Sequence, residues 1–324
     1  MLNLVERRNL WYLISLALIV PGLIAFALFG VRLGIDFTGG TVWELQFPRT
    51  DLQTLEVRQT IINANVVGSE DPLVQIGGGE QANTQTALIR LRNLREGSPQ
   101  KAQLAEALRA RYGAFTELRL ENVGPSVGQT VSRNSVFAVA AASVGILLYL
   151  AYAFRKVKRP FLYGICAIVA MLHDVLLVLG VFAILGQLFG YEIDALFVTA
   201  LLTVIGFSVH DTIVVFDRIR ENQLRRPAMD FAQVVNYSLN QTFVRSINTS
   251  LTVVFTLLAL SLFGGATIRT FVLALLIGVL SGTYSSIFNA SQLLVSWERG
   301  DIQRWFRFGR RRTAGPRPAS AAGD

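Results

Sequence analysis

The chain has 324 residues, of which 52% are hydrophobic and only 16% are charged, and its mean hydropathy is +0.45. This composition excludes an ordinary soluble domain and is typical of an integral membrane protein. The formal net charge of +8 is unevenly distributed, because residues 31–134 are balanced at 11 basic and 11 acidic residues.

Six apolar runs are long enough to cross a membrane, since about 20 residues of helix span the hydrocarbon of a bilayer. They cover residues 11–30, 135–154, 161–185, 194–217, 246–263 and 268–294. The first run has the basic start of a signal peptide, but its apolar core is long for that role, so we expect a retained anchor. The sequence thus predicts an α-helical integral membrane protein with six transmembrane helices.

The polar segment after the first run predicts a separate α+β domain. Residues 41–47 alternate as a half-buried strand does, and a capping box at Thr50 opens a helix to about residue 65. Strands follow at 73–76 and 86–92, then a helix from Ser98 to Tyr112 and a last strand at 115–121. The order βαββαβ indicates a ferredoxin-like fold. The expected domains are 1–30 (N-terminus and first helix), 31–134 (inserted domain), 135–296 (helices two to six) and 297–324 (basic tail).

Two acids lie inside apolar runs, each directly after a histidine: Asp174 after His173 and Asp211 after His210. A charged side chain at the centre of a bilayer costs about 2.5–3.5 kcal/mol even on the mildest scale, so such an acid is a functional candidate. Asp217 lies beside Arg218 at the end of its run, where a local ion pair is the favoured explanation and a functional role is the alternative.

Polar residues on the fourth and fifth runs recur at helical spacing. Arg245 opens a stripe on the fifth run with Asn248, Thr249, Thr252 and Thr256. On the fourth run, one face contains Thr199, Thr203, Gly206, His210 and Asp217, with Asp211 about 100° away. We expect Asp211 and Arg245 to form a switchable buried ion pair in a proton relay. The alternative is a static pair, which would stabilise the bundle little.

The charge pattern predicts the orientation. The basic flanks of alternate runs carry Arg7 and Arg8, residues 155–159, residues 218–226 and residues 299–317, whereas the other connections carry almost no basic residue. Both termini are therefore expected in the cytoplasm and residues 31–134 on the outer face. The Arg-rich tail suits this topology and anionic lipid, with RNA binding as the alternative, and beyond Thr313 we expect disorder.

Four motifs in order carry a family resemblance: GIDFTGGT after the first run, HDVL in the third, GFSVHDTIVVFDRIREN in the fourth and RSINTS at the start of the fifth. They resemble the SecF family, the smaller subunit of the bacterial SecDF protein-export factor in the RND superfamily. The resemblance covers the chain to about Trp297. One departure is His210, since members of that family often carry a small polar residue there.

The resemblance implies a function. A SecF subunit acts with SecD beside the SecYEG channel in the inner membrane, with a YajC-type accessory protein, and uses proton flow to pull unfolded preproteins outward. The proton-pathway residues of this subunit match Asp211 and Arg245, and a further acid comes from SecD. Candidate relay or lining residues are His173, Asp174, His210, Asp217, Asn248, Thr249 and Thr252. The segment with Gly34, Asp36, Gly39 and Gly40 would be the hinge or linker between domain and bundle.

Two other functions remain open: a proton-coupled small-molecule exporter of the RND type, and a scaffold that transports nothing. An enzyme is not expected, because no nucleophile–base pair or metal-ligand spacing occurs. No cofactor, metal or nucleic-acid partner is expected, and the proton gradient is the expected energy source, with Na⁺ as the other coupling ion to test.

Overall fold

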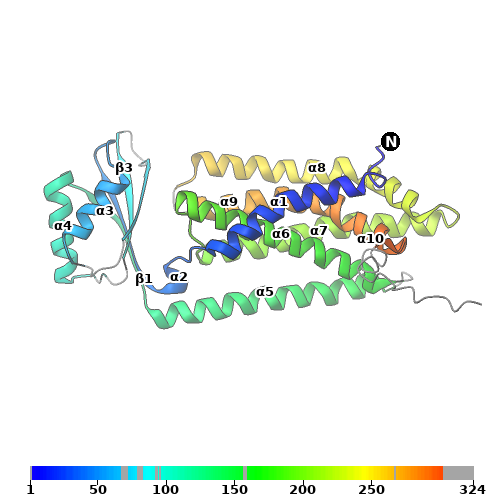
Figure 1. The fold of residues 1–324 in the computed structure, drawn as a ribbon, viewed down its shortest axis with the longest axis horizontal. Coiled ribbons are helices and arrows are strands. Elements are labelled where there is room, and N and C mark those ends of the chain that lie inside the picture. The colour runs from blue at the N-terminus through cyan, green and yellow to red at the C-terminus, as the bar shows by residue number, and fades with distance from the viewer. Residues whose placement is uncertain are drawn as a thin grey trace, which may run out of the picture.

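A computed structural model describes residues 2–66, 72–78, 83–91, 94, 96–155, 159–265 and 268–301. The tail predicted to be disordered lies outside these residues. An elongated helical bundle carries a small α+β domain at one end (Figure 1).

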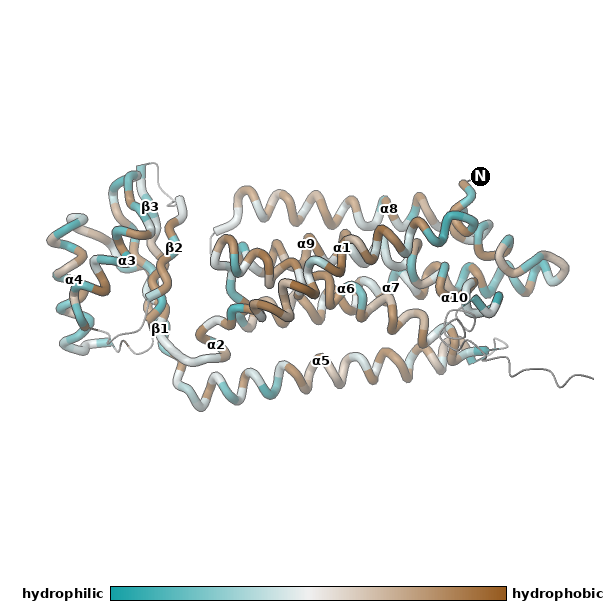
Figure 2. The backbone as a smooth tube through the Cα atoms, in the orientation of Figure 1, coloured by the Kyte–Doolittle hydropathy of each residue, from teal (hydrophilic) through white to brown (hydrophobic). Residues whose placement is uncertain are grey.

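Among the described residues, six long helices build the bundle. They are α1 (Arg8–Phe29), α5 (Pro125–Ala153), α6 (Pro160–Phe189), α7 (Ala195–Arg225), α8 (Phe231–Phe263) and a last helix composed of α9 (Arg269–Ser285), the π-helix η2 (Ser286–Ala290) and α10 (Ser291–Glu298). Each is long and apolar enough to cross a membrane, and Figure 2 shows the apolar residues along the bundle. The six predicted runs are confirmed.

The α+β domain contains β1 (Gly40–Phe47), α3 (Thr54–Asn63), β2 (Leu73–Gly78), β3 (Gln85–Leu91), α4 (Pro99–Tyr112) and β4 (Thr116–Val123). Its four strands form an antiparallel sheet in the order β2-β3-β1-β4, as the predicted ferredoxin-like fold requires. Helices α3 and α4 cover the sheet face away from the bundle, and Trp43, Leu45 and Phe47 pack in the core between them (Figure 1).

Of the two predicted helix starts in this domain, one is confirmed and one is wrong. Ser98 caps α4 as predicted, accepting a hydrogen bond from the N–H of Lys101 at 3.2 Å. The capping box at Thr50 is wrong, because α3 begins at Thr54. Asp51 instead pairs with Arg49, and the N–H of Leu52 donates to the side chain of Gln85 at 2.8 Å. The predicted domain limit at residue 134 falls inside α5, which begins at Pro125.

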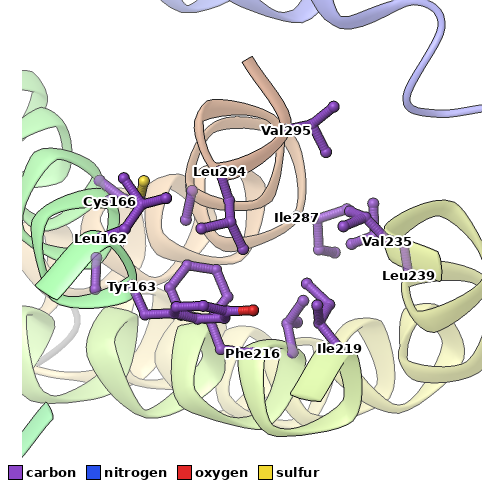
Figure 3. Close-up of a cluster of buried hydrophobic side chains, with 14 of the residues drawn as sticks. Leu162, Tyr163, Cys166, Phe216, Ile219, Val235, Leu239, Ile287, Leu294 and Val295 are labelled. Carbon is purple, nitrogen blue, oxygen red and sulfur yellow. The ribbon is translucent and has the colours of Figure 1, made fainter. Parts of the chain in front are cut away.

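The bundle core divides into two apolar clusters. One fills the half away from the α+β domain, where Tyr163 and Phe216 pack with Ile219, Ile287 and Leu294 (Figure 3). The other, which includes Phe182 and Phe197, fills the half nearer that domain. The polar residues described below lie on the helices that these clusters hold together.

Glycines permit the closest helix contacts. A Cβ atom on Gly180 of α6 would lie 2.7 Å from the Cα of Gly22 in α1, so the two backbones touch. Gly278 of α9 packs instead against the side chain of Val204 in α7. By contrast, a Cβ atom on Gly145 of α5 would meet no atom within 4 Å.

Replacing Gly180 by valine should separate α1 from α6 and destabilise the chain by about 1–3 kcal/mol, the usual result of overpacking. Thermal unfolding of the purified chain in detergent would measure the loss. Gly145→Val is the matched control, because its side chain has open space. Equal unfolding temperatures for the two variants would contradict the close contact.

Candidate functional site

Asp211 lies on the inward face of α7 and is 8% exposed. Its Oδ1 accepts a hydrogen bond of 2.7 Å from the hydroxyl of Ser246 on α8, and its Oδ2 accepts one from the hydroxyl of Ser286 in η2. Three helices therefore meet at this carboxyl group. Both donors are neutral, so they stabilise the ionised acid without cancelling its charge.

Asp174 of α6 forms a second buried carboxyl site and is fully buried. Its Oδ2 accepts hydrogen bonds of 2.6 Å from Ser208 of α7 and Ser285 of α9, and its Oδ1 accepts one of 2.6 Å from Ser281. His173 Nδ1 lies 3.1 Å from the same Oδ1. This acid thus ties α6, α7 and α9 together.

The predicted ion pair between Asp211 and Arg245 is not formed in the structure. Arg245 directly precedes Ser246, and successive helical residues point about 100° apart, so the serine faces Asp211 and the arginine points away. Arg245 is exposed and lines a hollow of about 540 Å³ between α5, α7 and α8, together with Asp217 and Glu221.

The other predicted lining residues form an outward polar face. His210 on α7 and Asn248, Thr249 and Thr252 on α8 are all exposed on the surface of the bundle. Asp217 makes a local ion pair, as expected, but its partner is Arg220 at 2.7 Å, and Arg218 pairs with Glu221 instead. The Nε2 atom of His173 is buried and has no hydrogen-bond partner among the described residues.

Sequence reasoning missed the serines that hold both acids. All five donors lie within the predicted apolar runs and resemble packing residues there. The available signal was their spacing, since Ser281 and Ser285 stand four residues apart in the last run and so share one side of a helix, whereas Ser286 points about 100° away from Ser285.

The GIDFTGG segment forms a packed junction between the domain and the bundle. Its first residues pair with the loop before α7: Gly34 N–H donates to the carbonyl of Ile193 at 2.7 Å, and Ile193 N–H donates to the carbonyl of Arg32 at 2.8 Å. Residues Ile35–Thr38 form the short helix α2. Asp36 then accepts a hydrogen bond of 2.8 Å from the N–H of Ala195, the first residue of α7.

Glycines make this junction close-packed. Gly39 has φ +75°, which side chains rarely adopt, and a Cβ atom there would lie 3.1 Å from the Cα of Pro125. A Cβ atom on Gly128 of α5 would lie 2.8 Å from the carbonyl oxygen of Phe37. The segment that links the domain to the bundle is therefore held by α5 and α7 at once.

Two further contacts join the sheet to the loop before α7. Arg90 of β3 makes an ion pair with Glu192, and the side chain of Gln75 donates to the carbonyl of Gly190 at 2.7 Å. They border a cavity of about 620 Å³ between the open face of the sheet and the end of the bundle. Burial lowers the pKa of Arg90, an effect that the charges of Asp194 and Asp36 oppose.

Asp194 caps α7 by accepting a hydrogen bond of 2.7 Å from the N–H of Phe197. Burial raises the pKa of Asp194, and the nearby Asp36 carboxylate adds to the increase, whereas the capping hydrogen bond and Arg90 oppose it. Within the described residues, no group of three or more His, Cys, Asp or Glu is placed to hold a metal ion.

Comparison with known families matches this architecture to protein-export subunits. The family described as "Protein export membrane protein SecD/SecF, C-terminal" matches residues 103–300, which include both buried acids and Arg245. The "SecD/SecF GG Motif" family matches residues 24–47, which include the whole GIDFTGG segment.

Individual relatives are also named as protein translocase subunits. The protein translocase subunit SecF of Thermobaculum terrenum is 59% identical over 313 residues, or 95% of this chain and 97% of that protein. The subunit SecDF of Bacillus subtilis is 35% identical over 305 residues, or 92% of this chain and 38% of the longer relative.

A crystal structure also matches. That of SecDF from Thermus thermophilus, described as a translocon-associated membrane protein, superposes with a TM-score of 0.81 at 32% identity. The match covers 92% of this chain and 39% of that one, so the chain spans about two fifths of the solved protein. These matches confirm the family resemblance and the predicted fold.

The raised pKa of Asp194 predicts a pH-dependent stability. The folded state binds this proton more tightly than the unfolded state, whose pKa is about 3.9, so the stabilisation is full below that value and is lost as pH rises through the raised pKa. Asp194→Asn keeps a capping oxygen but cannot titrate. The unfolding temperature of wild type minus that of Asp194→Asn should therefore fall as pH rises from about 4.

Asp51 provides a control whose pKa shift has the opposite direction, because its hydrogen bond with Arg49 lowers the pKa of this exposed carboxyl. The unfolding temperature of wild type minus that of Asp51→Asn should not fall as pH rises. A difference for Asp194→Asn that is constant with pH would show that its burial has no effect on titration.

Proposed function

The chain belongs to the SecF family of protein translocase subunits, and from this premise we propose that it uses proton flow through Asp211 to assist preprotein export. The single observation that carries the proposal is a buried carboxyl group in α7 whose only described side-chain donors are two neutral hydroxyls, those of Ser246 and Ser286. Such a group can gain and lose a proton without leaving a partner charge unpaired.

SecD is the partner that best fits the outward polar face of α7 and α8. Some relatives, including that of B. subtilis, are SecDF proteins in which this chain matches only part of a longer chain. Polar side chains facing lipid are unfavourable, so a second membrane subunit is expected to cover His210, Asn248, Thr249 and Thr252. An acid supplied by SecD would then face Arg245, which the hollow between α5, α7 and α8 leaves accessible.

The orientation that we propose is supported by the charges at the two ends of the bundle. The N-terminus, the α5–α6 and α7–α8 connections and the end of α10 lie together, away from the α+β domain (Figure 1). This end carries Arg8, Arg159, Arg225 and Arg299, which favours the cytoplasm of the bacterial inner membrane. The α+β domain then lies on the outer face, where an emerging preprotein would be accessible to it. SecYEG, a YajC-type protein, preproteins and lipid are the further proposed partners.

Proton binding at Asp211 would act on α7 and on the helices beside it. A carboxylate only accepts hydrogen bonds, whereas the protonated acid also donates one, so uptake of a proton changes the contacts with Ser246 and Ser286. Movement of one charge across the membrane provides about 2.3 kcal/mol per 100 mV, enough to bias two arrangements of a helix.

Helix α7 also provides the path to the outer domain. Asp211 lies 16 residues after Ala195, or about 24 Å along the helix axis at 1.5 Å per residue. Ala195 is bonded to Asp36, which lies four residues before β1. A displacement of α7 at the acid would therefore reach the α+β domain through this capping contact.

The test measures preprotein export into inverted membrane vesicles that contain SecD and this chain, after the ATP-driven step, with the proton gradient present or collapsed. We expect the gradient to add a late increment of export that Asp211→Asn and Arg245→Met both remove. Asp217→Asn should keep the increment, because Asp217 is exposed and pairs locally with Arg220. A parallel series with a sodium gradient identifies the coupling ion.

Survival of the increment in both variants would show that the buried charges are structural, and the chain would then act as a scaffold. Copurification with SecD checks that each variant still assembles.

A further inference from the structure

Two consecutive residues of the last helix bind two different buried acids. Ser285, at the end of α9, donates to Asp174 at 2.6 Å, and Ser286, at the start of η2, donates to Asp211. The two carboxyl groups thus contact adjacent residues of one backbone, at the point where α9 changes to the π-helix η2. A displacement of the helix at either acid therefore also displaces the serine that donates to the other acid.

Each of these hydroxyls also has a second acceptor within its own helix. Ser285 Oγ lies 3.2 Å from the carbonyl oxygen of Gly282, and Ser286 Oγ lies 3.1 Å from that of Thr283. Either hydroxyl can therefore turn from a carboxyl group to its own helix without being left unbonded. Protonation of Asp211 would favour that turn at Ser286, because the acid then accepts fewer hydrogen bonds.

Asp174 holds the same region of α9 in place. Three serine hydroxyls converge on this fully buried carboxyl group, one from α7 and two from α9. Gly282 keeps the helices close, since a Cβ atom there would lie 3.1 Å from the Cβ of Ser208. The position of Ser286 relative to Asp211 is consequently set by how tightly Asp174 binds Ser285.

We propose that Asp174 is a positioning residue for proton uptake at Asp211 and acts through Ser285 and Ser286. This inference rests on the proposed function of Asp211. When Asp211 takes up a proton, α9 stays attached to α6 and α7 at Asp174, while the segment from Ser286 onward is released from α7. That segment begins with a π-helix, a form that often occurs at functional sites and that can return to α-helix with a change of register.

The titratable and charged groups around this cluster are few. α6 contributes His173 beside Asp174, α7 contributes His210 beside Asp211, and α8 contributes Arg245. On α9 the only titratable side chain near the two serines is Tyr284, which donates to the carbonyl of Trp11 on α1. A variant of Ser285 changes none of these groups, so it isolates the positioning effect from any change in charge.

Infrared titration of the purified complex with SecD in lipid vesicles tests the inference. The signal is the carbonyl band of the protonated acid that Asp211→Asn abolishes, followed as a function of pH. Ser285→Ala should leave Ser286 less well placed to stabilise the ionised form, and should raise the pH midpoint of this band by about one unit, as expected for loss of a hydrogen bond to the charged form. Ser285→Thr, which keeps the hydroxyl, should restore the wild-type midpoint.

Ser296→Ala is the matched control, because Ser296 lies on α10 and bonds to Tyr12, away from both acids. Asp174→Asn is the second variant, and it should also displace the midpoint while copurification with SecD is retained. Wild-type midpoints in both Ser285→Ala and Asp174→Asn would overturn the inference. The export test can succeed while this one fails, whereas the absence of any band that depends on Asp211 would overturn the proposed function as well.

Discussion

The need to satisfy two carboxyl groups inside an apolar bundle is the constraint on which the arrangement of its helices depends. An ionised acid in such surroundings must receive hydrogen bonds, and here serine hydroxyls supply them to both Asp174 and Asp211. The choice of donor matters. A fixed arginine partner would hold an acid in its ionised form, whereas neutral hydroxyls leave both protonation states accessible and can themselves turn to another acceptor.

Short donors require close helices. A serine hydroxyl reaches only a little beyond its own Cβ atom, so the backbones of α6, α7 and α9 must approach one another to give the contacts of 2.6 Å at Asp174. Gly278 and Gly282 permit this approach, because the first packs against Val204 and the second against Ser208. Small residues in the last helix therefore serve the polar cluster as much as they serve general packing, and their positions, one turn apart, match those of Ser281 and Ser285.

The sequence predicts those features that depend on periodicity and composition. Apolar runs predict the six helices, because the signal for each helix lies within its own segment. Alternating strand patterns and the Ser98 cap of α4 predict the elements of the α+β domain for the same reason. It also places Asp211 about 100° from the outward polar face that contains His210. It could not predict which residue of α8 meets this acid, since that depends on the rotation of α8, and a rotation of one residue exchanges Arg245 for Ser246. The start of α3 also involves a partner distant in the sequence, since the N–H of Leu52 donates to the side chain of Gln85 at 2.8 Å and α3 begins only at Thr54.

Helix α7 is the element through which the two ends of the molecule can communicate. Its N-terminus is capped twice, by its own Asp194 and by Asp36 from the segment that leads into β1. One capping contact is worth about 0.5–2 kcal/mol, which is close to the work of moving one charge through 100 mV, so Asp36 alone would be a weak link. The backbone pairing of Gly34 with Ile193, in the loop before α7, reinforces it, and the glycine contacts with Pro125 and Phe37 attach the same segment to α5. Because these contacts would have to break together, an axial shift of α7 is more easily transmitted to the α+β domain than absorbed at the junction.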